Sequence, residues 1–213
     1  GARIVSCSVI MPTWSDGEGG GGVHQALADA LGKGDKPDDL LFFAAAGNTA
    51  QRHWGGRFHD GGDGWHEWAP GRTENRISPW AGETPSVEMC WPTGAVYELS
   101  LRDMTANREA AHAEAVECAS YCCAAARFEP EVGHSYAARV RLVRGTPGTF
   151  HLTILGGGLE EITARGSVPF PGDGAEVIAV SAVDGEGRRP DYCSCGGDGK
   201  PELAAVVPFP SLW

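Results

Sequence analysis

The chain has 213 residues, of which 42% are hydrophobic and 21% charged, so it has an ordinary globular composition and room for one large domain or two small ones. Its formal net charge of -11 argues against nucleic acids and anionic membranes as main partners. No apolar run approaches the roughly 20 residues that cross a bilayer, and no signal peptide is visible. The chain opens with Gly1 and runs almost directly into a strand-like stretch. This suggests a segment of a longer protein and leaves the localisation unknown.

Residues 2–48 have the pattern of a β-α-β unit. Ala2–Ile10 is a short apolar run rich in β-branched residues, and Leu40–Ala46 is a second, continuous apolar run. Between them, Val23–Gly32 carries apolar residues at helical spacing and ends in a glycine. A loop is expected from the end of this helix to Asp39. Continuous apolar strands beside a helix predict a parallel sheet that is covered on both faces.

The middle of the chain, from about Thr49 to Asp173, has a different pattern. Short runs of alternating apolar and polar residues are separated by turn residues, which predicts an antiparallel sandwich. These runs are Ser86–Trp91, Val96–Asp103, Ser135–Val143 and Thr149–Leu155. An alanine-rich stretch at 104–127 leaves two alternatives open, a helix with a blurred apolar period or a long loop with one helical turn.

The pattern of a parallel sheet returns after residue 173, in Ala175–Asp184 and Glu202–Val207. The sequence therefore predicts a discontinuous α/β part at 1–53 and 167–213. An inserted β-sandwich domain at 54–166 would interrupt it.

Three stretches, in order, resemble the subtilisin-like serine peptidases. They are Ala2–Ile10 with its following helix, "LLFFAAAGN" from Leu40 to Asn48, and "VPFPGDGAEVIAV" with the later "KPELAA" between Val168 and Ala205. The resemblance implies an α/β fold: a partial subtilisin-like parallel sheet with helices, interrupted by an antiparallel, jelly-roll-like insert. The insert itself resembles the pre-peptidase C-terminal type of sandwich.

The resemblance also implies site residues. Asn48 would donate its side-chain N–H to the oxyanion of a tetrahedral intermediate. An asparagine that merely ends a strand by turn chemistry is the alternative. Ala45, Ala46 and Gly47 would line the pocket for a substrate side chain, although small residues also serve tight packing. The backbone at Ser8, Val9 and Ile10 would pair with the substrate, and Ile10 stands where the family usually has glycine.

The catalytic triad of that family is not expected within this chain. Its aspartate and histidine would precede Ala2, its serine would follow Ala205, and neither Gly-Thr-Ser-x-Ala nor His-Gly-x-His occurs. His24 lies on a predicted helix and is interpreted as a surface or packing residue. The resemblance thus implies part of a serine endopeptidase that acts on peptides or proteins and is inactive as this chain alone. The alternatives are a non-catalytic sandwich that binds carbohydrate or protein, and a pseudopeptidase.

No cofactor is predicted. Cys118, Cys122, Cys123, Cys193 and Cys195 do not have the spacing of common zinc modules, and structural cysteines are the alternative. The histidines and acids of residues 53–67 match no standard metal motif, so this stretch is interpreted as a linker into the sandwich. An exposed sheet edge predicts self-association.

Overall fold

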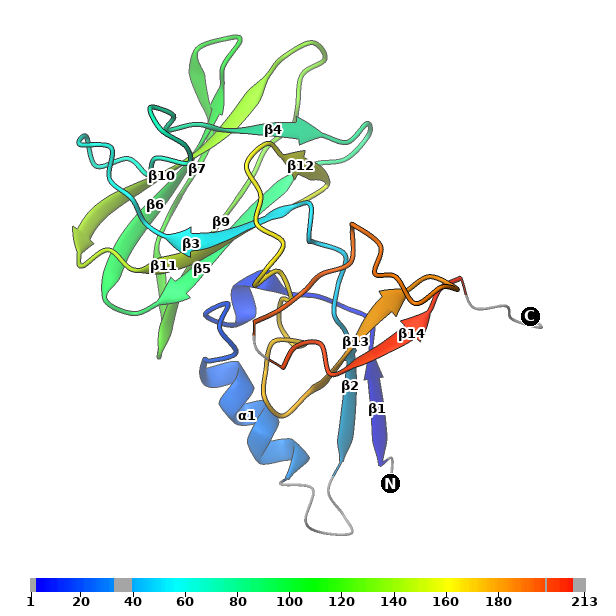
Figure 1. The fold of residues 1–213 in the computed structure, drawn as a ribbon. Coiled ribbons are helices and arrows are strands. Elements are labelled where there is room, and N and C mark those ends of the chain that lie inside the picture. Colours follow the sequence, from blue (N-terminus) through cyan, green and yellow to red (C-terminus); the bar gives the residue numbers. More distant parts are fainter. Residues whose placement is uncertain (1–2, 33–39, 198, 209–213) are drawn as a thin grey trace.

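The computed structural model describes residues 3–32, 40–197 and 199–208, and its strands form three sheets (Figure 1). The smallest is a parallel sheet of four strands, in the order β1 (Ile4–Cys7), β2 (Leu41–Ala45), β13 (Ile178–Val183) and β14 (Leu203–Val206). The described residues contain one α-helix, α1 (Gly22–Leu31), and a short 3-10 helix, η1 (Pro12–Trp14). None of these residues forms a helix with the length and apolar character needed to span a bilayer.

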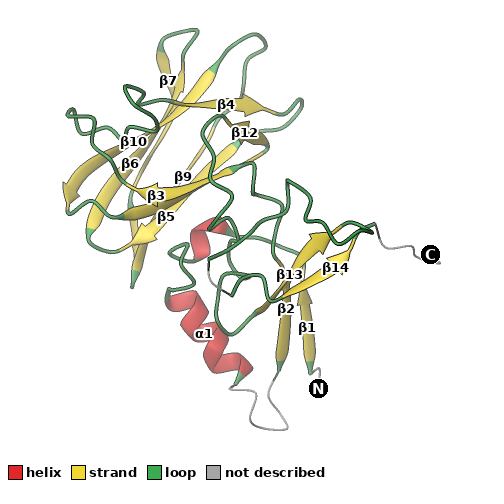
Figure 2. Cartoon of the chain, viewed as in Figure 1, coloured by secondary structure: helices red, strands yellow, loops and turns green. Residues whose placement is uncertain are grey.

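The other two sheets are antiparallel and face each other as a sandwich at one end of the molecule (Figure 2). The first contains β12 (Gly157–Leu159), β4 (Asn75–Pro79), β10 (Tyr136–Gly145), β6 (Ala95–Asp103) and β7 (Arg108–Glu114), in that order. The second contains β3 (His53–Arg57), β11 (Thr149–Leu155), β5 (Ser86–Pro92), β9 (Tyr121–Arg127) and β8 (Val116–Cys118).

The main core fills the space between these two sheets. Alternate residues of β11 point inward, and Phe150, Leu152 and Ile154 are fully buried there together with Trp91 and Tyr97. Burying each such side chain contributes about 1.5–3 kcal/mol. The intervening residues of β11 point to the outer face of the second sheet. This face therefore carries polar side chains toward η1 and toward the glycine-rich loop of residues 15–21 that follows η1.

The predicted α/β class is wrong. Ten of the described strands lie in antiparallel sheets, four lie in the parallel sheet, and one α-helix accompanies them. The sequence patterns at both ends suggested a parallel sheet covered by helices. However, the alternating runs of the middle segment are more numerous, and they make the chain mostly β.

Both alternatives for residues 104–127 are also wrong, because this stretch forms β7, β8 and β9. Alanine favours helices by intrinsic propensity, but strand preference depends on cross-strand packing. Ala124 and Ala126 are buried in the sandwich core, where small side chains fit beneath the large residues of β5. The other strand predictions agree with the structure to within a few residues. The loop expected up to Asp39 and the start of the first run at Ala2 lie outside the described residues.

A buried histidine joins α1 to the segment that returns from the sandwich. His24 is 3% exposed, with Nε2 2.9 Å from Asp173 Oδ1 and Nδ1 2.5 Å from Glu176 Oε1. Burial opposes the charge of this ring. The hydrogen bonds and charges of Asp173 and Glu176 outweigh burial, so the pKa of His24 is raised. The ring is therefore an imidazolium that donates to one carboxylate on each side.

This arrangement predicts a specific pH dependence of stability. Since the folded pKa of His24 lies above the unfolded value of about 6.5, the stabilisation is complete below pH 6.5 and is lost as the pH rises through the folded pKa. We expect the free energy of urea unfolding to fall above pH 6.5, and less steeply in His24→Gln. His24→Ala should lose about 3–5 kcal/mol at pH 6, because two buried carboxylates then lack their cation. His59→Gln, at a 72% exposed side chain, is the control. Equal pH slopes in wild type and His24→Gln would contradict this account.

Candidate functional site

A pocket of about 560 Å³ opens on the uncovered face of the parallel sheet. Alternation along the strands puts Ile4, Leu41 and Leu203 on this face, where they are 63%, 49% and 50% exposed. Ala44 and Ala179 lie on the opposite face and are buried. The pocket extends from this face to the carboxyl ends of β1 and β2, the edge at which parallel sheets commonly bind ligands.

The turn after β2 is held in a defined shape. Gly47 has φ +92°, and a Cβ there would lie 3.1 Å from Ser194 Oγ and 3.3 Å from Pro169 Cδ, so glycine suits both the backbone and the space. The backbone N–H of Thr49 donates to Ser194 Oγ at 2.9 Å, and its hydroxyl donates to the Ser167 carbonyl at 2.6 Å. The residues on either side of Asn48, Gly47 and Thr49, are therefore held in place by packing and hydrogen bonds.

The amide of Asn48 is exposed and oriented by Arg52. The guanidinium of Arg52 donates to both the backbone oxygen and Oδ1 of Asn48. Its Cζ lies over the ring of Trp80, 4.9 Å from the ring centroid. Because Oδ1 is the acceptor, the Nδ2 hydrogens face away from Arg52. No other residue in the described ranges accepts from Nδ2, so this group can donate to a bound molecule.

The residues predicted for the site separate into two groups. The pocket is lined by Ser8, Ile10, Ala45, Gly47 and Asn48. Val9 is 58% exposed and lies outside the pocket lining, while Ala46 is 1% exposed and packs with Val168 and Ala179.

Sequence reasoning missed the far wall of this pocket. Tyr192 and Cys193 line it, and the Cys193 sulfur accepts from the backbone N–H of Ala182 at 3.2 Å and lies 3.1 Å from Ser181 Oγ. These residues come from a loop without regular structure, and the sequence pointed to Cys193 only as one of the cysteines whose spacing does not fit zinc.

A second pocket, of about 610 Å³, lies where the glycine-rich loop meets the outer face of the sandwich. A chain of hydrogen bonds runs along its wall. Glu18 Oε1 is 2.9 Å from His151 Nε2, His151 Nδ1 is 3.0 Å from His53 Nε2, and His53 Nδ1 is 2.8 Å from the Thr163 carbonyl oxygen. The stretch of residues 53–67 interpreted as a linker thus begins with strand β3, and its first residue belongs to this network.

Three glycines make room for this histidine pair. A Cβ at Gly17 would lie 2.4 Å from His151 Cδ2, one at Gly55 would lie 2.7 Å from His151 Nδ1, and one at Gly166 would lie 3.2 Å from His151 Cε1. His151 was not singled out from the sequence, although its place in the alternating run Thr149–Leu155 assigns it to the outer face.

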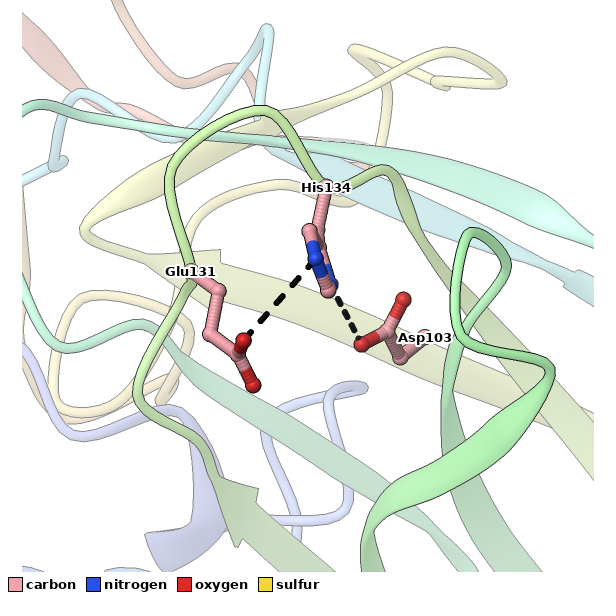
Figure 3. A group of neighbouring side chains, drawn as sticks. All are labelled: Asp103, Glu131 and His134. Atoms are coloured by element: carbon pink, nitrogen blue, oxygen red, sulfur yellow. Dashed lines mark hydrogen bonds and ion pairs between the residues drawn. The ribbon is translucent and has the colours of Figure 1, made fainter.

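A third cluster joins Asp103, Glu131 and His134 (Figure 3). His134 lies between the two carboxylates, with Nδ1 2.8 Å from Asp103 Oδ2 and Nε2 3.8 Å from Glu131 Oε2. Burial raises the pKa of Asp103. The Ala106 N–H and His134 lower it by more, so the net shift is downward. The guanidinium of Arg108 also contacts both carboxylates, so a protein cation already lies beside them. This donor set acts as an ion-pair network between loops.

The described residues do not combine a nucleophile with a base. Within 3–32, 40–197 and 199–208, no serine hydroxyl or cysteine sulfur is hydrogen-bonded to a histidine nitrogen. Ser15 donates to Asp173 Oδ2 at 2.6 Å, and that carboxylate is shared with His24. The sequence predicts His24 as a surface or a packing residue. The structure buries it, so the surface role is wrong.

Comparisons with known proteins place the fold next to a protease. No protein-family model and no curated protein matches the sequence. Among solved structures, the chain is similar to the CspB protease of Clostridium perfringens, with a TM-score of 0.67 and 11% identity. The match covers 95% of this chain and 48% of that chain, so this chain spans about half of its length. At this identity the likeness shows the fold alone.

The sequence resemblance to the subtilisin-like peptidases is not supported as a family assignment. No family model matches, and the structure is mostly antiparallel sheet with one described α-helix, unlike the α/β fold that the resemblance implied. The three stretches that carried the resemblance form β1 with α1, β2, and parts of β13 and β14, which together make only the smallest of the three sheets.

The packing of Gly17 against His151 can be tested by substitution. Gly17 and Gly82 have φ values of +82° and +77°, but a Cβ at Gly82 would meet nothing within 4 Å. Gly17→Ala and Gly82→Ala therefore share the backbone strain, and only the first overpacks its site. We expect Gly17→Ala to be less stable by a further 1–3 kcal/mol or so in urea unfolding and to shift the NMR signals of His151. Equal losses in both variants would contradict this packing.

Proposed function

We propose that this chain is the substrate-binding part of a protease and that Asn48 donates a hydrogen bond to the carbonyl oxygen under attack. The observation that carries the proposal is the pocket beside an exposed amide whose orientation is held by Arg52. The protease fold of the similar structure supports it.

The chemistry of the pocket suits a peptide. Ser8 and Val9 lie at the open end of an edge strand, where an extended peptide can add its backbone hydrogen bonds. Ala45, Gly47 and Ala182 leave a space with little bulk for one substrate side chain, and Ile10 narrows it. With the peptide seated there, the Nδ2 hydrogens of Asn48 would meet the negative charge that develops on the carbonyl oxygen. The nucleophile and its base would come from residues outside the described ranges.

The role of Asn48 has a kinetic signature. In the protein that carries this chain, we expect Asn48→Leu to lower kcat about 10²–10³-fold with a nearly unchanged KM, because the donor acts mainly in the transition state. The measurement is steady-state hydrolysis of a fluorogenic peptide. Gln51→Leu removes an exposed amide three residues away and should leave both constants unchanged.

Two outcomes would argue against this role. If Asn48→Leu leaves kcat unchanged, the amide does not stabilise the transition state. If it raises KM alone, Asn48 binds the substrate equally in the ground state and contributes no rate acceleration.

We also propose self-association through the parallel sheet. β1 and β14 are its edge strands, and its open face exposes Ile4, Leu41 and Leu203. Such edges and apolar faces pair readily with another chain, and lysine blocks this pairing. We expect sedimentation velocity to show concentration-dependent association that Leu203→Lys weakens. Val132→Lys, on a fully exposed loop residue of the sandwich, should not weaken it. A monomer at all concentrations would contradict the proposal.

A further inference from the structure

The histidine pair of the second pocket lies on the outer face of the sandwich sheet, away from the pocket beside Asn48. His151 on β11 is paired with Gly55 on β3 and Cys90 on β5, and its side chain is 8% exposed. His53 behind it is 2% exposed. Glycines on three segments let the backbone pack closely against this imidazole, since a Cβ at Gly17, Gly55 or Gly166 would lie within 3.2 Å of it.

The hydrogen bonds assign the protons. The Thr163 carbonyl can only accept, so His53 Nδ1 carries a hydrogen. Burial lowers the pKa of His53 to about 3, so this ring is neutral and its Nε2 accepts the hydrogen bond from His151 Nδ1–H. His151 therefore presents Nε2 toward Glu18 and the pocket.

Glu18 occupies this position as a carboxylate. Its hydrogen bond with His151 lowers the pKa of Glu18 against the effect of burial. A carboxylate can only accept, so His151 Nε2 donates the hydrogen of this bond. The two partners differ in exposure, with side chains that are 57% exposed for Glu18 and 8% for His151. The exposed Glu18 side chain can return to water at little cost, whereas the buried Nε2–H of His151 would be left without an acceptor.

We propose that this pocket binds a carboxylate of a ligand, with His151 Nε2–H as the principal donor and Glu18 as the resting occupant that the ligand replaces. The exchange keeps a carboxylate acceptor at His151 Nε2, since one carboxylate takes the place of another. Backbone N–H groups of Glu18 and Gly20 are tied to Asp16 Oδ1 at 2.8 Å, so only the side chain of Glu18 needs to move.

The other charged groups of the pocket are compatible with this assignment. Asp173 is engaged by His24 and Ser15, and Lys200 donates to two backbone carbonyls at 2.6 Å and pairs with Glu202. Arg165 adds positive charge to the wall. Cys90, opposite His151 on β5, is a neutral thiol because burial raises its pKa well above the ordinary value. The partner of His151 in this pocket is therefore the mostly exposed side chain of Glu18.

The carboxylate of Glu18 competes with a ligand carboxylate for His151 and so lowers the affinity of the ligand for the wild-type protein. A group held near its site by a short flexible connection competes at an effective concentration in the millimolar range. A ligand carboxylate should bind the wild-type protein weakly and bind at least tenfold more tightly when Glu18 is removed.

The test uses three probes on the full chain: the peptide acetyl-Gly-Glu-Gly-amide, the same peptide with glutamine, and free glutarate. Binding is measured by calorimetry and by the NMR signal of His151 Cε1–H. We expect Glu18→Ala to bind the glutamate peptide at least tenfold more tightly than wild type, and the glutamine peptide not to bind. Adding His151→Gln to Glu18→Ala should abolish binding. Glu114→Ala removes an exposed acid on β7 and should leave the wild-type affinity unchanged.

The outcomes separate the ligand sources. Binding of the peptide without glutarate assigns the site to acidic side chains of polypeptides, and binding of both assigns it to carboxylates in general. The proposal is overturned if no probe binds Glu18→Ala, or if binding survives His151→Gln. Glu18→Gln keeps the side-chain volume and serves in place of Glu18→Ala if the latter does not fold. These measurements do not involve Asn48, so their result is independent of peptide hydrolysis.

Discussion

The structure depends on the pairing of β2 with β13, two strands that the whole sandwich separates in the chain. Phe43 lies opposite Ile178 and Ala45 opposite Val180, and the Ala46 N–H continues the ladder to the Val180 carbonyl. This pairing requires the chain to leave β2, build ten strands and return beside its point of departure. The turn at Gly47 and the segment that carries Ser167 and Ser194 meet for the same reason, and both pockets form around that crossing point.

The second sheet of the sandwich is covered on both faces, and its face toward the part that carries the parallel sheet is polar. Its inner face is an aromatic and aliphatic core, while its outer face carries His53, His151 and Cys90 into contact with a loop of the other part. Buried polar groups are stable only when they are hydrogen-bonded. The Glu18–His151–His53 chain and the His24 pair satisfy this requirement, and each links residues from opposite ends of the sequence.

Local patterns predicted most individual elements. Alternation predicted β5, β6, β10 and β11, and helical spacing with a terminal glycine predicted α1. Local patterns gave a wrong prediction at 104–127. The helix propensity of alanine favours a helix there, but packing against β5 stabilises strands. The fold class was also predicted wrongly, because the apolar runs at the chain ends indicate a parallel sheet with helices, whereas most of the described strands come from the alternating middle segment. The small residues before Asn48 indicate a pocket or tight packing, but no local pattern predicts that Ser194, Tyr192 and Cys193 lie beside this turn.

The sequence by itself determined the strands that have a clear apolar or alternating pattern, where their apolar faces lie and that Asn48 ends a strand behind small residues, because these properties depend on neighbours within a few positions. Only the tertiary structure decided that Arg52 orients that amide, that Glu18 meets His151 and that His24 is charged between Asp173 and Glu176. Hydrogen bonds and pKa shifts of this kind depend on groups far apart in the chain, whose approach is set by packing and not by spacing.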